Sequence, residues 1–305
     1  MKKITLGTSN VEAGEIALGC MRMDKLSKTE AAKVIENALE VGVDLFDHAD
    51  IYGKGMSEEV FADALEFVSA SRDQLILQTK CGIRNGFFDF SKEHIIDSVE
   101  GSLRRLKTDY IDILLLHRPD ALMEPEEVAE AFTKLKKSGK VQYFGVSNQN
   151  PMQIERLKKY LDQDLIINQL QLSLMHTPMI DAGFNVNMAN APAIVRDSNI
   201  LDYSQLHQMT VQAWSPFQYG MIEGVFIGNE QYPEVNVKLT EIAEKKGVSE
   251  SAIAIAWILR HPARMQPVVG SMNPDRLKEI AKASNVKLTR EEWYELYRAA
   301  GNKLP

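Results

Sequence analysis

The chain has 305 residues, of which 45% are hydrophobic and 25% charged, an ordinary composition for a folded globular protein. Its formal net charge of −7 argues against broad affinity for nucleic acid or anionic membranes, because both favour clustered Lys and Arg. Its two cysteines are too few for a disulfide framework and lack metal-ligand spacing, and no export-like leader or long apolar run occurs, so we expect a cytoplasmic protein without a membrane span.

Short apolar runs alternate with longer amphipathic ones along most of the chain. Each short run is apolar at successive positions, which is typical of strands buried on both faces of a parallel sheet. The predicted strands are Ile16–Gly19, Val43–Phe46, Leu75–Thr79, Ile111–Leu116, Val141–Val146, Leu165–Leu170, Val211–Trp214 and Pro267–Val269.

Helical patterns occupy most of the intervals between these strands. Ser27-Lys28-Thr29-Glu30 resembles a capping box and predicts a helix that runs to Glu40 and ends before Gly42. The other predicted helices cover roughly Glu58–Val68, Lys92–Arg105, Pro125–Ser138, Met152–Tyr160, Val235–Lys246 and Asn273–Ala283. This alternation indicates an α/β fold of the (β/α)8 TIM-barrel type, and the even composition predicts one domain over residues 1–305.

Three further segments fall outside the repeat. Ile4–Thr8 and Glu15–Leu18 are expected to pair as an N-terminal β-hairpin that closes the bottom of the barrel. Thr289 begins a second capping box and predicts an extra C-terminal helix. The stretch Leu174–Gln208 is expected to form a long irregular loop over the C-terminal face of the barrel, where active sites of this fold lie.

Polar side chains stand at or just after the ends of three consecutive predicted strands. Asp47 and Tyr52 follow the second strand, Lys80 the third and His117 the fourth. A lysine ammonium beside a tyrosine would lower the tyrosine pKa, and Asp47 would keep that lysine charged. His117 could hydrogen-bond a substrate carbonyl. The set therefore predicts proton donation to a carbonyl oxygen as a hydride reaches its carbon.

Short motifs accompany these residues along the chain. They are Gly42–Gly53 (GVDLFDHADIYG), Gln78–Lys80 (QTK), Asp112–His117 (DILLLH), Gly139-Lys140, Phe144–Asn148 (FGVSN), Asn168-Gln169, Ala213–Pro216 (AWSP) and Gly270-Ser271. In this order they resemble the aldo-keto reductase superfamily, and its bacterial members more than the vertebrate aldose reductases. The resemblance covers nearly the whole chain.

The resemblance implies an NADPH-dependent reductase of aldehyde or ketone carbonyls, with Tyr52 as the general acid. The catalytic tetrad that it implies is Asp47, Tyr52, Lys80 and His117. The nicotinamide would contact Ser147, Asn148 and Gln169 and stack on Trp214. The residues implied at the pyrophosphate are Ser215, Phe217 and Gly220. Those implied at the 2′-phosphate and adenine are Ser271, Met272, Asn273, Arg276 and Glu279.

Some positions depart from the family pattern. Gly270 stands where a lysine often precedes the serine, and Ile280 where an asparagine often follows the glutamate. Arg276 remains, and a guanidinium suits a phosphate dianion, so NADPH is the favoured cofactor while use of NADH is left open. Met21, where relatives often place a tryptophan against the substrate, gives the substrate pocket a shape of its own.

Two other functions compete with this interpretation. A cofactor-binding partner of another protein, as the potassium-channel β subunits of this fold are, would keep the same tetrad. A metal-dependent barrel hydrolase is suggested by His48 and Asp50 beside Asp47, but the other histidines show no matching ligand spacing, so we predict no metal site. We expect a small-molecule carbonyl substrate.

Overall fold

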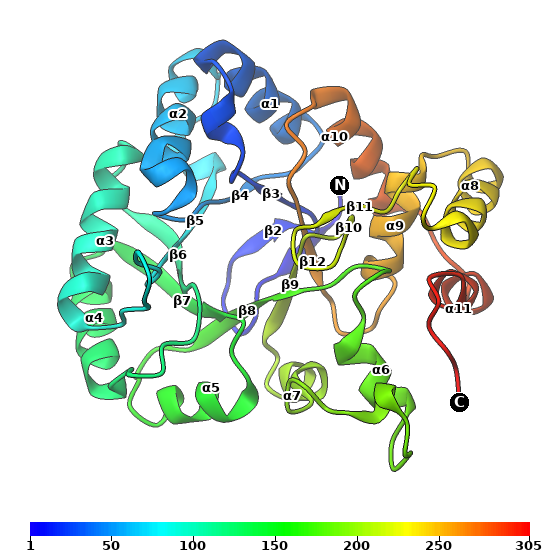
Figure 1. Cartoon of the computed structure of the whole chain (residues 1–305). Helices are drawn as coiled ribbons and strands as arrows, with labels where there is room; N and C mark the ends of the chain where they lie inside the picture. The colour runs from blue at the N-terminus through cyan, green and yellow to red at the C-terminus, as the bar shows by residue number, and fades with distance from the viewer.

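The computed structural model describes residues 1–305, and its centre is a closed barrel of parallel strands surrounded by helices (Figure 1). The strands follow one another around the barrel in the order β12-β3-β4-β5-β6-β7-β8-β9. Their bounds are β3 (Ala17–Gly19), β4 (Leu45–Asp47), β5 (Ile76–Cys81), β6 (Ile111–Leu116), β7 (Val141–Ser147), β8 (Leu165–Gln171), β9 (Thr210–Trp214) and β12 (Gln266–Val269). The predicted (β/α)8 barrel is confirmed.

Alternate residues of each strand point to opposite faces, and two apolar clusters result. Ile113 and Leu115 of β6 belong to a cluster of 9 buried residues that fills one end of the barrel interior. Leu114 and Leu116 of the same strand belong to a cluster of 65 buried residues, which packs the strands against the helices. Both faces of β6 are therefore apolar, which explains the continuous apolar run Ile111–Leu116 in the sequence.

An antiparallel hairpin closes the end of the barrel that the small cluster fills. It pairs β1 (Lys3–Thr5) with β2 (Glu12–Gly14), and Leu6 and Ala13 are fully buried in that cluster. The predicted partner Glu15–Leu18 is wrong, because Ala17–Gly19 already pairs with β12 and β4 as a barrel strand. The hairpin is thus confirmed, but its second strand lies earlier in the chain.

Helices cover the outside of the barrel. Those that alternate with strands are α1 (Lys28–Glu40), α2 (Met56–Ala64), α3 (Lys92–Arg105), α4 (Pro125–Lys137), α5 (Pro151–Lys158), α8 (Pro233–Lys246), α9 (Glu250–Leu259) and α10 (Pro274–Ala281). The capping boxes at Ser27 and Thr289 both form, and the second begins the extra helix α11 (Arg290–Ala299) beside α8. No helix is both long and apolar enough to cross a membrane.

Helix α9 was absent from the prediction because its sequence is apolar at nearly every position. Such a helix shows no amphipathic period and is typical of one buried on most sides. Residues 252–258 are all buried, and the Trp257 ring stacks on Trp293 of α11 with a centroid distance of 4.9 Å. Each indole also donates a hydrogen bond to the other residue's carbonyl, so the extra helix is fixed to the barrel through α9.

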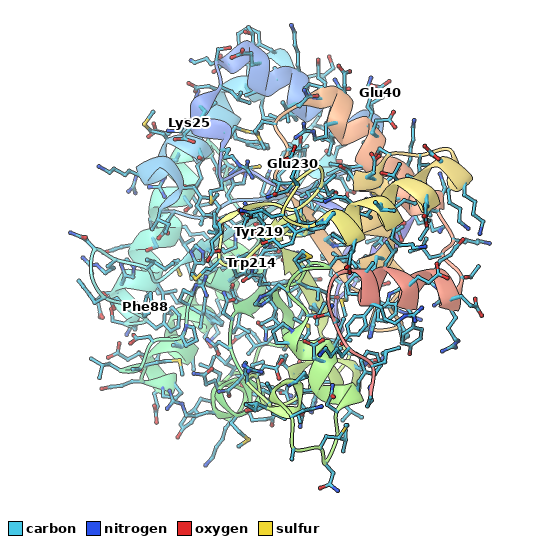
Figure 2. The ribbon with its side chains drawn as sticks, turned by 45° about the vertical axis from the view of Figure 1, so that its right-hand side comes forward. Lys25, Glu40, Phe88, Trp214, Tyr219 and Glu230 are labelled. Carbon is cyan, nitrogen blue, oxygen red and sulfur yellow. The ribbon has the colours of Figure 1, made fainter.

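The segments above the barrel mouth are more ordered than predicted. The stretch Leu174–Gln208 contains α6 (Pro178–Phe184) and α7 (Ile200–Leu206), so its description as an irregular loop was wrong. After β9, a small hairpin pairs β10 (Gln218–Tyr219) with β11 (Gly224–Val225). Figure 1 shows this hairpin in front of the barrel strands, and Figure 2 shows Trp214 and Tyr219 near the centre of the molecule.

Candidate active site

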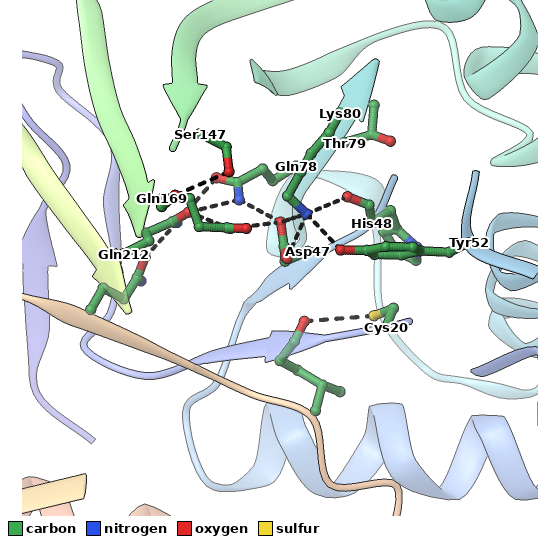
Figure 3. A network of polar contacts seen from close by, with 12 residues as sticks. Cys20, Asp47, His48, Tyr52, Gln78, Thr79, Lys80, Ser147, Gln169 and Gln212 are labelled. Carbon is green, nitrogen blue, oxygen red and sulfur yellow. Dashed lines mark hydrogen bonds and ion pairs between the residues drawn. The ribbon is translucent and has the colours of Figure 1, made fainter. Parts of the chain in front are cut away.

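The carboxyl ends of β4, β5 and β6 bring four polar side chains to the barrel mouth. Asp47 ends β4, Lys80 lies near the end of β5, Tyr52 lies in the turn after β4, and His117 directly follows β6. The Lys80 Nζ is fully buried and lies 2.7 Å from an Asp47 carboxylate oxygen, 2.7 Å from the His48 carbonyl and 3.3 Å from the Tyr52 hydroxyl (Figure 3). The three ammonium hydrogens thus meet three acceptors, and Lys80 is fully satisfied.

The direction of the Lys80–Tyr52 hydrogen bond decides what the phenol can do. Because an ammonium has no lone pair, Lys80 donates and the Tyr52 oxygen accepts. The phenolic hydrogen of Tyr52 is therefore free to donate to another acceptor, and Tyr52 lines the cavity at the barrel mouth. The geometry leaves the tyrosine as a hydrogen-bond donor towards that cavity.

The protonation states differ from the sequence prediction for Tyr52. Burial raises the pKa of Tyr52, and although the Lys80 charge opposes this, the Asp47 charge adds to it and the pKa stays above its ordinary value. For Lys80, burial alone would lower the pKa, but Asp47 and Tyr52 outweigh it and raise the pKa. The prediction of a lowered tyrosine pKa was wrong, because it neglected the cost of burying a phenolate. The phenol of Tyr52 is therefore protonated at neutral pH.

His117 lines the same cavity as Tyr52. Burial, with help from the Lys80 and Arg118 charges, lowers the pKa of His117 well below its ordinary value, so the imidazole is neutral at pH 7. Its ring lies edge-on to the Tyr52 ring at a centroid distance of 5.9 Å. A neutral imidazole carries one N–H, so His117 can donate a hydrogen bond without adding a charge.

A layer of four glutamines fills the barrel interior beside Asp47. Gln78 Nε2 donates to Asp47 Oδ1 at 2.6 Å, and Gln169 Nε2 donates to the same oxygen at 3.2 Å. Gln212 accepts from both of these amides and donates to Gln266 at 2.8 Å. Gln266 in turn donates to the Gly14 carbonyl at 2.6 Å. This buried network holds Asp47 from the side opposite Lys80 (Figure 3).

Sequence reasoning missed three of these glutamines, Gln78, Gln212 and Gln266, as members of the site. A signal was present, because barrel interiors are dominated by branched aliphatic side chains and a buried amide requires partners. Gln169 was predicted as a nicotinamide contact, and it lines the cavity while its amide nitrogen is turned towards Asp47 and Gln212.

One cleft of about 610 Å³ joins most of the predicted site residues. The predicted catalytic residues that line it are Asp47, Tyr52 and His117, while Lys80 lies behind them. The predicted substrate and cofactor residues that line it are Met21, Ser147, Asn148, Gln169, Trp214, Ser215, Phe217, Ser271 and Arg276. Residues from distant parts of the chain therefore share a single cavity.

Four predicted cofactor residues do not line the cleft. The Gly220 carbonyl accepts a hydrogen bond from Gln171, and Met272 packs against the large apolar cluster. Asn273 caps α10 by accepting from the Arg276 backbone N–H at 2.9 Å. The fourth, Glu279, forms an ion pair with Lys282 at the helix surface. Each of these four residues therefore makes its contacts with other parts of the protein and not with the cleft.

A short hydrogen-bonded chain fixes the wall of the cleft between β7 and β9. Trp214 Nε1 donates to Asn148 Oδ1 at 3.2 Å, and Asn148 Nδ2 donates to Ser147 Oγ at 2.7 Å. Asn148 and Ser215 both have left-handed backbone angles, with φ of 57° and 53°, which is uncommon for residues other than glycine. Helix α5 is capped by Asn150, so Ser147 and Asn148 are left free to line the cleft.

Arg22 is a cleft residue that the sequence did not predict. A side chain at Gly270 would begin 3.2 Å from the Arg22 guanidinium, so the arginine occupies the space over the glycine. Arg22, Gly270, Ser271 and Arg276 all line this end of the cleft. An arginine from the segment after β3 therefore lies beside Gly270, a proximity that the linear sequence does not reveal.

His48 and Asp50, considered above as metal ligands, have separate surroundings. The fully buried His48 ring packs edge-on against Phe61 at a centroid distance of 4.7 Å. Burial raises the pKa of Asp50 to about 6, with a further contribution from Glu58. No group of three or more His, Cys, Asp or Glu side chains is arranged to hold a metal ion.

Comparison with known proteins agrees with this geometry. A model of the aldo/keto reductase family matches residues 3–300. The chain belongs to this family. Among its relatives, this aldo/keto reductase is 35% identical to the uncharacterized oxidoreductase YcsN of Bacillus subtilis, over 98% of each chain. It is also 35% identical to a 6-dehydroglucose reductase of Agrobacterium fabrum, over 99% of each chain.

Solved structures share the same fold at lower identity. The crystal structure of an aldo-keto reductase from Klebsiella pneumoniae in complex with NADPH has a TM-score of 0.79 and 23% identity, and it covers 99% of this chain and 96% of its own. Members of the aldo/keto reductase family are NAD(P)H-dependent oxidoreductases, so this chain is an enzyme of that class.

Proposed function

We propose that this aldo/keto reductase uses NADPH to reduce aldehyde or ketone carbonyls to alcohols, with Tyr52 as the proton donor. The observation that carries the proposal is the arrangement around Lys80, whose three hydrogens are taken by Asp47, the His48 carbonyl and the Tyr52 oxygen. This arrangement leaves the phenolic hydrogen for a substrate oxygen and keeps a positive charge beside the phenolate that proton transfer would create.

His117 is proposed to orient the carbonyl. Its neutral N–H can donate to the same substrate oxygen as Tyr52 without competing for the proton. When bound in this cleft, NADPH would supply a hydride for the carbonyl carbon. The chain supplies the proton at the Tyr52 hydroxyl, a second donor at His117 and a buried ammonium at Lys80. Because Asp47 is held by Lys80 and two glutamines, these donors are fixed before the substrate arrives.

The lining of the cleft fits a dinucleotide cofactor. At one end, Ser147, Asn148 and Gln169 offer amide and hydroxyl groups for the nicotinamide carboxamide, and Asn148 holds the Trp214 ring that would stack on it. At the other end, Arg22, Ser271 and Arg276 surround the N-terminus of α10, which favours an anion. Two guanidinium groups there suit the 2′-phosphate and pyrophosphate, which favours NADPH over NADH.

Some of the remaining predicted cofactor residues are proposed to contact the cofactor, and others to support the segments around it. Ser215 and Phe217 line the cleft and are proposed to flank the pyrophosphate. Gly220, Met272, Asn273 and Glu279 are proposed to shape the segments that surround the cofactor, and Asn273 does so by capping α10. Met21 is proposed to contact the substrate. A cytoplasmic location remains part of the proposal.

Turnover of the purified chain tests the proposal. NADPH oxidation should be rapid with simple aldehydes or ketones, and much slower with NADH at the same concentration. Tight NADPH binding, measured by fluorescence, without turnover across a broad carbonyl panel would instead support a cofactor-binding partner protein and would refute the reductase function.

A further inference from the structure

Three arginines at the barrel mouth have no ion-pair or hydrogen-bond partner in the protein. Arg22, Arg118 and Arg276 line the main cleft, and none of their guanidinium groups forms an ion pair or a hydrogen bond. The only carboxylate in the lining of that cleft is Asp47, which Lys80 and two glutamines already occupy. In a chain with a net charge of −7, three unpaired cations around one cavity indicate anionic ligands.

The phosphates of the proposed cofactor would pair with two of these arginines, but not with the third, Arg118. Arg22 and Arg276 lie at the Gly270–Ser271 end, which follows β12. Arg118 follows β6, and β6 and β12 are four strands apart in either direction around the eight-stranded barrel. The backbone of Arg118 is therefore on the side of the mouth opposite the phosphate end, and its guanidinium lies against the Trp214 ring, whereas the guanidinium over Gly270 is that of Arg22. Phosphates held by Arg22 and Arg276 would not satisfy Arg118.

Arg118 lies instead beside the groups that would act on the substrate. It directly follows His117, and its guanidinium carbon is 5.5 Å from the centroid of the Trp214 ring. The side chain is half-buried and lines both the main cleft and a second cavity of about 390 Å³, and Trp214 also lines both. The only carboxylate lining that second cavity, Asp197, accepts a hydrogen bond from the Asn199 backbone.

A half-buried guanidinium has five N–H donors and no acceptor, and the Arg118 donors have no protein acceptor, so they are free to bind an anionic ligand in the cleft. A carboxylate matches its planar fork and can accept two parallel hydrogen bonds. We propose that Arg118 binds a carboxylate of the substrate, and that the enzyme prefers oxo acids and semialdehydes that carry a carboxylate over neutral carbonyl compounds. This proposal rests on the reductase function proposed above and names the substrate class of that site.

Matched substrate pairs test the proposal with the intact enzyme and NADPH. The pairs are succinic semialdehyde with butanal, and 4-carboxybenzaldehyde with 4-methylbenzaldehyde. For the wild-type enzyme we expect kcat/KM to be at least about tenfold higher for the carboxylate member of each pair, mainly through a lower KM. Arg118→Leu should abolish this preference, because kcat/KM should fall at least about tenfold for the carboxylate member and much less for the neutral member. Arg118→Lys should retain part of the preference.

Arg104→Leu is the matched control, because it removes an exposed arginine of α3 that does not line either cavity. It should keep the full preference. Inhibition of butanal reduction by butyrate gives a second readout in the wild-type enzyme, which does not depend on the folding of a variant. Butyrate should compete with butanal.

The outcomes separate the two proposals. Equal kcat/KM within each pair for the wild-type enzyme, or an equal loss for both members in Arg118→Leu, would overturn the carboxylate site while leaving the reductase function intact. Absence of butyrate inhibition would also overturn the carboxylate site. NADPH binding with no turnover of any of the four carbonyls would overturn the reductase function itself.

Discussion

The inner and outer halves of the active site satisfy their charges in opposite ways. In the inner half, Lys80 and Asp47 are buried and every hydrogen of the ammonium has a protein acceptor. In the outer half, Arg22, Arg118 and Arg276 form no ion pair or hydrogen bond within the protein, and Arg118 contacts the Trp214 ring. A buried charge without a partner strongly destabilises the folded protein. A charge at the solvent-open mouth of the barrel stays hydrated, so it needs no protein partner before a ligand binds. The inner half is therefore complete in the free protein, and the outer half is completed by ligands.

The two halves also come from different parts of the fold. Asp47, Lys80 and the four glutamines lie on barrel strands, whose positions are fixed by the sheet. Arg22 and Arg118 lie on segments that follow strands, and Arg276 lies in the first turn of α10. Loop and helix-terminal residues can change without disturbing the barrel. We therefore expect substitutions in the inner half to affect stability and chemistry together, and those in the outer half to affect ligand binding alone.

The largest effect is expected for Lys80→Met. The change removes the charge that stabilises the Tyr52 phenolate, so the reduction rate at saturating substrate should fall by about 10²–10⁴-fold. It also leaves Asp47 as a buried unpaired carboxylate, which should cost about 3–5 kcal/mol in the free energy of unfolding. The double variant Asp47→Asn/Lys80→Met should recover stability but not activity. Stability that recovers together with activity would contradict this account.

The next largest effect is expected for Arg276→Ala in the outer half. Loss of a charge-assisted hydrogen bond to phosphate costs about 1.5–3 kcal/mol, so the Kd for NADPH should rise by about 10–100-fold. The Kd for NADH should change little, and the melting temperature should stay constant. Arg298→Ala, which removes an exposed arginine of α11, is the control and should change neither affinity. Equal losses for both cofactors would remove Arg276 from the 2′-phosphate site.

A smaller effect is expected for Gln212→Leu in the glutamine layer. Gln78 Oε1 and Gln266 Oε1 each lose their donor in a buried environment, which should cost about 1–3 kcal/mol per acceptor and lower the melting temperature. Asp47 keeps its contacts with Gln78, Gln169 and Lys80, so the reduction rate should fall by less than about tenfold. Gln205→Leu on the surface of α7 is the control. An unchanged melting temperature in Gln212→Leu would show that the layer does not support the inner half.

The smallest effect is expected from pH between 7 and 9. The acid form of Tyr52 exists below its pKa, which burial raises above the ordinary value near 10. The neutral form of His117 exists above its pKa, which burial lowers well below 6.5. Both groups are thus in their active forms across this window, and the single-turnover rate should change by less than about twofold. A rate that falls steadily from pH 7 to 9 would indicate a lowered tyrosine pKa.

The sequence predicted the strands better than the contacts between elements. The limits of β6 and α3 agree with the prediction, because Ile111–Leu116 is continuously apolar and Lys92–Arg105 has a clear cap and period. The predicted second strand of the hairpin, Glu15–Leu18, was wrong. Ala17–Gly19 pairs with β12 and β4 to close the barrel, so β1 pairs with the earlier strand β2 instead. The single domain over residues 1–305 and the individual roles of the site residues stay predictions.

The features of the site that the sequence did not predict arise from residues that are close in space but distant in the chain. Arg22 takes the place of a side chain at Gly270 although the two are far apart in the chain. The glutamine layer joins four strands whose glutamines have no shared motif. The raised pKa of Tyr52 reflects how deeply the ring is buried, which the spacing of Asp47, Tyr52 and Lys80 does not contain.

A single-turnover measurement of Tyr52→Phe tests the central claim most directly. The variant keeps the aromatic ring and the Arg22–Arg276 end of the cleft, so NADPH should bind with an affinity within about threefold of the wild-type value. Without the phenolic hydrogen, the rate of NADPH oxidation by bound aldehyde should fall by about 10²–10⁴-fold. A rate equal to that of the wild-type enzyme, with NADPH bound, would contradict the assignment of Tyr52 as the proton donor.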